Sequence, residues 1–399
     1  MENLSTLQTR LIQSERLAPQ YMPSVQPPVY HASTIIFPTT DALFNRHWTK
    51  PYDYSYGTHG TPTTYTLADQ IALLEGGKYC LLAPSGLSAI NLVNSTFLAT
   101  GDEVWLADNM YGPNLEHLQY LQKQYDIVLK IYNPTDVESF QPSERCKLLW
   151  LEAAGSVTME FPDLVGLVKK AKSQGILTVL DNTWGAGLAF QAFDFSSEHL
   201  AVDITVHALT KYPSGGGDVL LGSIVTRDEH LHHQMLRMHA LQGVSVSGDD
   251  CAQIYRSLPH MQLRYQQHHQ NCLQFIAFLT QQTQFQQVLH PSLPACAGHQ
   301  YWQDICIDGL GAGLVSVIFD ECYHWSDIRR FCDALKVFKL GYSWGGPMSL
   351  AMLYDVQKMR QLTQTHLKKG YLVRFCIGLE HPQDLIQDVQ QALTVLTVK

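Results

Sequence analysis

Residues 178–184 read TVLDNTW, the pattern of a short buried strand that ends in the carboxylate of Asp181. Residues 206–218 read VHALTKYPSGGGD, in which a second β-rich run is followed by Lys211 and a glycine-rich turn. In α/β sheets, the side chains that bind ligands gather at the carboxyl ends of the strands. We therefore expect Asp181 and Lys211 to lie close together at one edge of a sheet.

The sequence around these two segments alternates between strand patterns and helix patterns. Continuous apolar strands separated by helices are typical of a largely parallel sheet that is covered on both faces. The sequence therefore predicts an α/β fold with a mostly parallel sheet sandwiched by helices. The strand patterns lie at 104–107, 148–151, 177–180 and 204–206, and the helix patterns lie near 115–121 and 164–168.

Length and changes of pattern indicate two domains preceded by an arm. The chain has 399 residues, and single hydrophobic cores stop growing at about 250–300 residues. Residues 1–60 are rich in Pro, Thr and Tyr, so we expect an N-terminal arm that contributes to a neighbouring subunit. We expect residues 61–250 to form the first domain and residues 251–399 a smaller α+β C-terminal domain. The latter shows helix patterns at 251–282 and 384–396 and strand patterns at 314–319 and 371–375.

The composition argues against several classes of protein. A net charge of −9 and a pI of about 6.0 give no general attraction for nucleic acid or for anionic membranes. The first residues lack a basic stretch followed by an apolar one, and no apolar run reaches the roughly 20 residues of a membrane helix. The nine cysteines form no CxxC pair, which is typical of reduced thiols. We therefore expect a cytoplasmic protein with no nucleic-acid or membrane partner.

Two groups of histidines invite a metal hypothesis. They lie at 230–233 and 268–269. Neither group has the spacing of a zinc helix, in which two histidines four residues apart flank a glutamate. We therefore expect solvated helix faces at both places and no bound metal.

Asp181 and Lys211 together match the needs of pyridoxal 5′-phosphate (PLP). A carboxylate keeps the pyridine nitrogen of PLP protonated, and a lysine forms a Schiff base with its aldehyde and then moves protons. Gly86 precedes a helical run, and such a helix terminus attracts phosphate, although Ser-Gly before a helix, here Ser85-Gly86, is more often a plain N-cap. Tyr111 follows a strand pattern, so it either stacks on a cofactor ring or packs as a half-buried tyrosine.

Five motifs make the chain resemble the trans-sulfuration (Cys/Met metabolism) family of PLP enzymes, from about residue 28 to about residue 396. The resemblance implies the PLP-dependent transferase type I fold and a homotetramer, a dimer of dimers with active sites between paired subunits. The motifs are YGTHGTPT at 56–63, LEGG at 74–77, LDNTW at 180–184, LTKY at 209–212 and VRFCIGLE at 373–380.

Two further motifs resemble the bacterial cystathionine β-lyases within that family. They are EAAGSVTME at 152–160 and YSWGG at 342–346. The resemblance implies β-elimination of L-cystathionine to homocysteine, pyruvate and ammonia. The alternatives are a related carbon–sulfur lyase, such as a cysteine desulfhydrase or a cystathionine γ-lyase or synthase, and a catalytically silent PLP-binding regulatory protein.

The same resemblance implies a role for each residue that matches a family motif. Lys211 is expected to bind PLP and shuttle protons, Asp181 to pair with the pyridine nitrogen, and Tyr111 to stack on the ring. The substrate α-carboxylate is expected to bind Arg374, in a pocket shaped by Ser343 and Trp344. The phosphate is expected to be held by Gly86, Leu87, Thr210 and, from the neighbouring subunit, Tyr56 and Thr58.

The chain departs from the family pattern at the expected phosphate site. Thr58 stands where an arginine is common, and the loss of that arginine removes a charge-assisted, bidentate contact. The departure predicts weaker retention of PLP, or compensation by another residue. The loop after Glu152 also has Ala153-Ala154 in place of Ser-Pro, which leaves the choice of substrate open.

Overall fold

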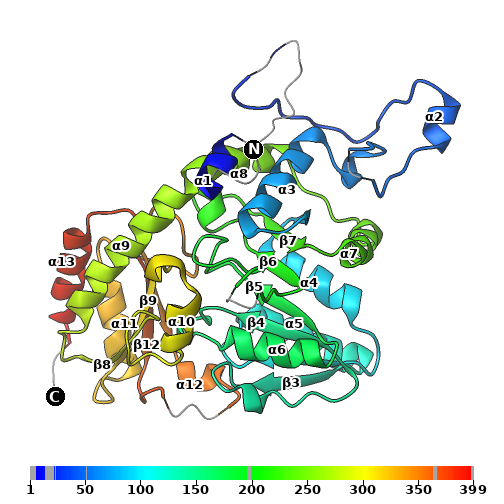
Figure 1. Ribbon diagram of the computed structural model, residues 1–399. Helices are drawn as coiled ribbons and strands as arrows, with labels where there is room; N and C mark the ends of the chain where they lie inside the picture. The colour runs from blue at the N-terminus through cyan, green and yellow to red at the C-terminus, as the bar shows by residue number, and fades with distance from the viewer. Residues whose placement is uncertain are drawn as a thin grey trace.

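The computed structural model describes residues 6–13, 22, 24–50, 52–195, 199–362 and 366–396. A seven-stranded sheet forms the centre of the larger part, with the order β1-β7-β6-β5-β4-β2-β3 (Figure 1). β3, β2, β4, β5 and β6 run parallel, whereas β7 is antiparallel to both of its neighbours. The strands are β1 (Tyr79–Ala83), β2 (Glu103–Ala107), β3 (Val128–Tyr132), β4 (Cys146–Glu152), β5 (Leu177–Asp181), β6 (Ile204–His207) and β7 (Gly222–Thr226).

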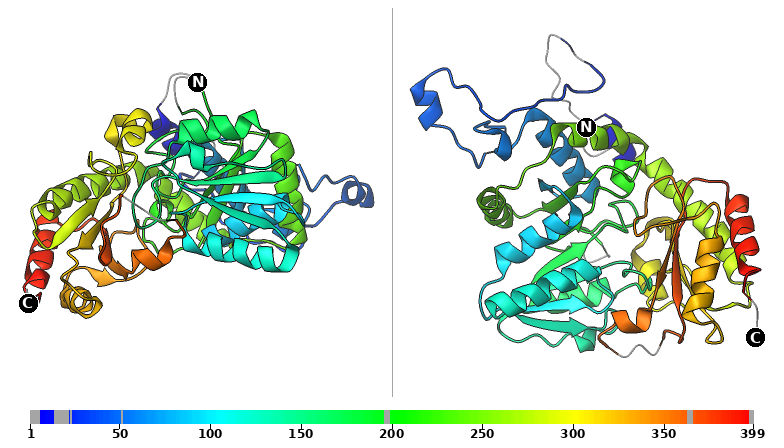
Figure 2. Two further views of the ribbon diagram at one scale, coloured as in Figure 1. Left: turned by 90° about the horizontal axis from the view of Figure 1, so that it is seen from below. Right: turned by 180° about the vertical axis from the view of Figure 1, so that it is seen from behind.

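Helices cover the large sheet on both sides, as the view from below shows (Figure 2). The central strands β2, β4, β5 and β6 are buried along nearly their whole length, because both faces of the sheet are covered. This arrangement confirms the predicted α/β fold. The helices of this part are α3 (Pro62–Glu75), α4 (Gly86–Phe97), α5 (Gly112–Tyr125), α6 (Leu164–Ser173), α7 (Glu229–Leu241) and α8 (Gly248–Ser257).

A second, smaller sheet of five strands has the order β10-β11-β12-β9-β8. It packs against helices and encloses its own hydrophobic core, which includes Phe275, Phe331 and Phe375. The strands are β8 (Phe285–Leu289), β9 (Leu314–Phe319), β10 (Lys339–Leu340), β11 (Leu350–Tyr354) and β12 (Leu372–Cys376), and the helices are α9 (Met261–Leu279), α10 (His299–Ile305), α11 (Trp325–Ala334), α12 (Val356–Met359) and α13 (Pro382–Leu393).

The long helix expected over 251–282 is interrupted. α8 ends at Ser257, a 3₁₀ turn spans Leu258–His260, and α9 begins at Met261. Pro259 lies in this turn, and proline lacks the N–H that an uninterrupted helix needs at that position. The interruption therefore follows from a single residue.

The described part of the N-terminal arm is exposed. α1 (Leu7–Ile12) packs on the body through Leu11, but the segment with α2 (Thr40–Phe44) projects away from it (Figure 1). Ile36 is 91% exposed and Phe44 is 79% exposed, an unusual position for large apolar side chains. The boundaries at 60 and 250 and the contribution of the arm to a neighbouring subunit remain predictions.

The expectation that both histidine groups are solvated was wrong in part. His268 and His269 are buried on α9, where His268 Nδ1 lies 2.6 Å from the Ile377 carbonyl oxygen. His232 is also buried and stacks on Tyr79. A hydrogen bond or an aromatic neighbour lowers the cost of burying a neutral imidazole. The sequence pattern did not reveal these neighbours. None of the described helices is long and apolar enough to cross a membrane.

Candidate active site

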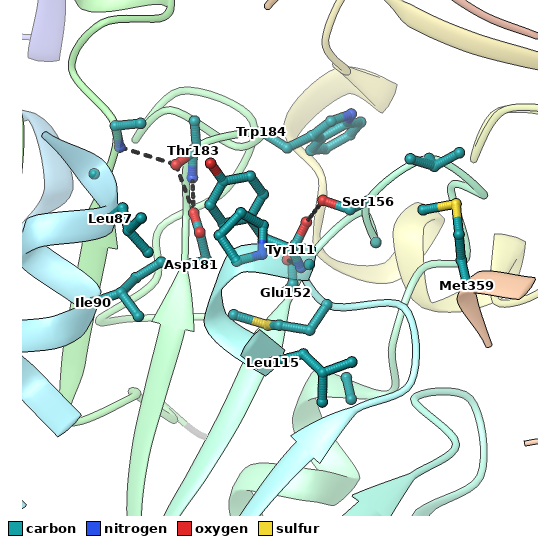
Figure 3. A pocket seen from close by; sticks show the side chains of 18 of the residues that line it. Leu87, Ile90, Tyr111, Leu115, Glu152, Ser156, Asp181, Thr183, Trp184 and Met359 are labelled. Atoms are coloured by element: carbon teal, nitrogen blue, oxygen red, sulfur yellow. Dashed lines mark hydrogen bonds between the residues drawn. The ribbon is translucent and has the colours of Figure 1, made fainter. Parts of the chain in front are cut away.

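A cavity of about 940 Å³ lies at the carboxyl edge of the large sheet (Figure 3). Residues after β2, β4, β5 and β6 form one side of it, and residues near β11 and β12 of the smaller sheet form the other. Nine of the eleven predicted site residues line this cavity. They are Gly86, Leu87, Tyr111, Asp181, Thr210, Lys211, Ser343, Trp344 and Arg374.

Lys211 follows β6 and turns its amino group toward the smaller sheet. Its Nζ donates a hydrogen bond to Ser343 Oγ at 3.1 Å and lies 5.6 Å from the centroid of the Trp344 ring. Burial lowers the pKa of Lys211, and the positive charge of Arg374 lowers it further. The neutral amine, which is the form that can act as a nucleophile or a base, is thereby favoured.

Asp181 ends β5 and is held by the next turn of the chain. Its Oδ1 accepts hydrogen bonds from the Thr183 amide at 3.0 Å and from Thr183 Oγ1 at 2.6 Å, and Thr183 Oγ1 in turn accepts from the Ala208 amide (Figure 3). Burial raises the pKa of Asp181, while the hydrogen bonds from Thr183 oppose the rise. A protonated pyridine nitrogen would supply the positive charge that this buried carboxylate needs.

A second buried carboxylate, Glu152, ends the neighbouring strand β4 opposite Asp181. It accepts hydrogen bonds from the Tyr111 amide at 2.7 Å and from Ser156 Oγ at 2.5 Å (Figure 3). Burial raises the pKa of Glu152 to about 8, and the charge of Asp181 contributes to the rise. Burial and the charge of Asp181 therefore favour the protonated form of Glu152, and its hydrogen bond fixes the backbone at Tyr111.

The N-terminus of α4 also lines the cavity. The Ser85 side chain accepts a hydrogen bond from the Ser88 amide at 3.0 Å and caps the helix, while Gly86 and Leu87 line the cavity. A Cβ atom at Gly86 would lie 2.6 Å from Ala208 Cβ, so glycine is needed where the two chain segments approach. Amide groups at such a helix terminus, together with the helix dipole, suit a phosphate.

The Thr210 hydroxyl is already engaged within the chain. Thr210 Oγ1 donates to the Leu221 carbonyl at 3.3 Å and accepts from the Leu221 amide at 3.2 Å. These bonds stabilise the turn that carries Lys211. Its predicted contact with phosphate remains a prediction.

Arg374 reaches the cavity from the middle of β12 and is 7% exposed. Its Nη2 donates to the Tyr342 carbonyl at 2.5 Å, and its guanidinium lies 5.6 Å from the centroid of the Tyr354 ring. Its buried Nε has no partner among the described residues. Arg374 lines the cavity, and a guanidinium in such a place suits the carboxylate of an amino acid.

Tyr56 and Thr58 lie apart from this cavity. Tyr56 is 46% exposed on the arm, where its hydroxyl lies 3.0 Å from Ser33 Oγ. Thr58 lines a separate hollow of about 260 Å³ together with His59. Neither residue lines the cavity of Lys211 within one chain, and their action across a subunit boundary stays a prediction.

Three residues of the site were not expected from the sequence. Glu152 and Thr183 lie within the quoted motifs, and the strand pairing that places Glu152 beside Asp181 becomes visible only in the sheet register. Arg360 also lines the cavity, from the segment after α12. No local pattern marks Arg360, because its partners are distant in sequence.

The family model of the Cys/Met metabolism PLP-dependent enzymes matches residues 8–394. The chain belongs to this family. It is therefore a member of a PLP-dependent enzyme family, and Lys211, Asp181 and the α4 terminus provide groups that fit the aldehyde, the pyridine nitrogen and the phosphate of that cofactor. The small-molecule substrates of this family are amino acids, as expected for a cavity that contains Arg374.

Individual relatives are similar over nearly the whole chain. A cystathionine beta-lyase of Bordetella avium is 33% identical over 94% of this chain and 92% of its own length. An L-alanine/L-glutamate racemase of Wolbachia pipientis is 31% identical over 97% of this chain and 96% of its own. The crystal structure of metB from Corynebacterium glutamicum superposes with a TM-score of 0.88, covers both chains completely and is 25% identical.

Proposed function

We propose that this family member is a carbon–sulfur lyase that cleaves the Cβ–S bond of L-cystathionine. The observation that carries the proposal is the convergence of Lys211 Nζ, Ser343 and Trp344 in one cavity with Arg374 and the loop 152–160, which has the β-lyase form. The similarity to the Bordetella cystathionine beta-lyase supports the same reaction. Water completes the balance, because L-cystathionine and water yield homocysteine, pyruvate and ammonia.

Arg374 begins the reaction by binding the α-carboxylate of the substrate. Its guanidinium lines the cavity and has the planar donor arrangement that a carboxylate accepts. The contact with the Tyr354 ring keeps the guanidinium on the cavity side of β12. The substrate Cα is thereby directed toward Lys211.

Lys211 then removes the proton from Cα. When bound, PLP supplies an electron-accepting ring, which Asp181 keeps protonated, and this ring stabilises negative charge at Cα. The lowered pKa of Lys211 provides a neutral Nζ to accept the proton, and the hydrogen bond to Ser343 orients it. Thr183 holds Asp181 in place during this step.

The electron pair left at Cα then forms a double bond to Cβ, and the Cβ–S pair leaves with sulfur. A proton delivered from Lys211 converts the departing thiolate to homocysteine. Tyr111 lines the same cavity, and partial burial followed by the charge of Asp181 raises the pKa of its hydroxyl, which therefore stays protonated. Hydrolysis of the remaining three-carbon fragment gives pyruvate and ammonia.

The proposal includes a cytoplasmic homotetramer in which the arm of one subunit approaches the cavity of its neighbour. The exposed apolar side chains Ile36 and Phe44 support such a contact. Tyr56 and Thr58, which lie on the same arm, would then face the phosphate of the neighbouring subunit.

Product analysis with L-cystathionine tests the proposed reaction. We expect equal amounts of homocysteine and pyruvate, whereas γ-cleavage would give cysteine and 2-oxobutyrate. Parallel assays of sulfide from L-cysteine and of D-alanine from L-alanine would detect a desulfhydrase and the racemase activity named for the Wolbachia relative. Bound PLP without any of these products would instead favour a silent binding protein.

A further inference from the structure

Arg360 joins the smaller sheet to two loops of the large sheet. Its Nη1 donates to the Asp108 carbonyl at 2.6 Å, and its Nη2 bonds to Thr158 Oγ1 and approaches the Ser156 carbonyl at 3.5 Å. Asp108 follows β2, and Ser156 and Thr158 belong to the loop after β4. One guanidinium therefore connects three segments of the chain that all line the cavity.

Glu160 provides the opposite charge for this connection. Its Oε2 lies 3.7 Å from Arg360 Nη2 and accepts from Asn109 Nδ2 at 3.1 Å, and its Oε1 lies 2.9 Å from His366 Nε2. The Arg360 and Glu160 side chains are 7% and 3% exposed. Buried ion pairs with several added hydrogen bonds fix geometry more than they stabilise, since desolvation offsets much of the attraction.

Backbone contacts extend the same connection. The Gln361 amide donates to Asp108 Oδ1 at 2.7 Å, and the Ser156 amide donates to the Asn109 carbonyl at 2.8 Å. We call Arg360, Glu160 and Asp108 the Arg360 latch. It holds Met359 and Gln361 in the cavity wall, on the side that Met359 marks in Figure 3, away from Asp181.

We propose that the Arg360 latch is a specificity-determining device, which fixes the outer wall of the cavity so that long, thioether-linked amino acids bind in one position. Lys211, Ser343 and Arg374 surround the reacting atoms, and no bond of the latch involves any of them. Met359, which the latch holds, lies across the cavity from Asp181 (Figure 3), so the latch would act on the distal part of a long substrate. The inference rests on the proposed lyase function.

The first test is the ratio of kcat/KM for L-cystathionine to that for β-chloro-L-alanine, a three-carbon substrate with a leaving group at Cβ. In Arg360→Lys, which keeps the charge but cannot bridge the same acceptors, we expect the cystathionine value to fall about 10-fold to 100-fold through KM. We expect the chloroalanine value and the absorbance of bound PLP to stay within about three-fold of wild type. Arg330→Met, which breaks an exposed pair with Asp327, is the matched control.

Equal losses with both substrates, or no loss with either, would overturn the proposal. Hydrogen exchange of the backbone over residues 356–362 gives a second readout that needs no substrate. We expect faster exchange in Arg360→Lys and in the milder variant Glu160→Gln, and unchanged exchange in Arg330→Met. Unchanged exchange in both latch variants would also contradict the latch, whereas a wild-type enzyme inactive on L-cystathionine would contradict the proposed function instead.

Discussion

Two buried glutamates, Glu152 and Glu160, stand at the two ends of one loop, and their pKa values shift in opposite directions. Burial raises the pKa of each carboxyl, and at the inner end Asp181 raises the pKa of Glu152 further, to about 8. At the outer end Arg360 and His366 outweigh burial and lower the pKa of Glu160 to about 2. Because both carboxyl groups are buried, the neighbouring charges decide the direction in which each pKa shifts.

The two ends of the loop have different roles. The inner end, formed by Glu152, Asp181 and Tyr111, lies beside Lys211 and keeps donors and acceptors ready for chemistry. The outer end, formed by Glu160 and Arg360, ties the smaller sheet to the large one and shapes the wall. Changes at the inner end should therefore alter the reaction, and changes at the outer end should alter which substrates bind.

The largest effect is expected at Lys211, next to the inner end. Lys211→Ala should lower kcat by at least about 10³-fold, because it removes both the Schiff-base amine and the proton acceptor. Peptide mapping after borohydride reduction should find the pyridoxyl group on Lys211 in the wild type. Lys358→Ala, which changes another lysine of the cavity lining, should keep both label and activity; a label on Lys358 would break the assignment.

The next largest effect is expected at Glu152, where two variants distinguish the role of its charge from the role of its hydrogen bonds. Glu152→Ala leaves the Tyr111 amide and the Ser156 hydroxyl without their acceptor and should destabilise the protein by about 1–3 kcal/mol. Glu152→Gln should cost much less, because a protonated glutamate and an amide are close in shape and neither is charged. Thermal unfolding and kcat measured at pH 7 check both variants, and equal losses would show that the negative charge is needed.

The two glutamates should also give opposite dependences of stability on pH in the protein without PLP. The folded-state pKa of Glu160 lies below its ordinary 4.5, so its contribution is present above pH 4.5 and is lost toward pH 2, by about 3 kcal/mol. The folded-state pKa of Glu152 lies above 4.5, so stability falls as the pH rises from 4.5 through about 8.

Unfolding free energies across this pH range measure the two contributions. Glu160→Gln should flatten the acid part of the curve, and Glu152→Gln should flatten the neutral-to-alkaline part. The reverse assignment, or two unchanged curves, would refute the comparison between the two ends.

The smallest effect is expected on the N-terminal arm, where Thr58 stands in place of an expected arginine. Thr58→Arg would introduce the arginine that the family resemblance led us to expect at this position, and we expect tighter retention of PLP by a few-fold. The measurement is the rate of PLP loss during dialysis, with Thr40→Arg, at an exposed position of the same arm, as a control for added charge. No gain would show that the chain already compensates for Thr58.

The sequence was sufficient to place Asp181 and Lys211 together, although it did not reveal Glu152 beside them. β5 and β6 are adjacent and parallel, so Asp181 and the chain leading to Lys211 emerge at the same edge, as the two opening motifs predicted. The cap at Ser85 and the glycine at 86 were also visible, because capping depends on neighbouring residues. Local rules therefore sufficed where the chemistry depends on strand ends and helix starts.

The outer end could not be predicted in the same way. Arg360 and Glu160 are 200 residues apart in number, and only the packing of the two sheets brings them together. The burial of His268 and His269 depends on acceptors and neighbours that are likewise distant, such as the Ile377 carbonyl. The antiparallel β7 between β1 and β6 is a further long-range feature that no apolar run reveals.

The most direct test of the central claim is the product balance from L-cystathionine, measured side by side for the wild type and Lys211→Ala. Our account predicts one homocysteine and one pyruvate for each molecule consumed by the wild type, and neither from the variant. Cysteine and 2-oxobutyrate from the wild type, or undiminished pyruvate from Lys211→Ala, would contradict it.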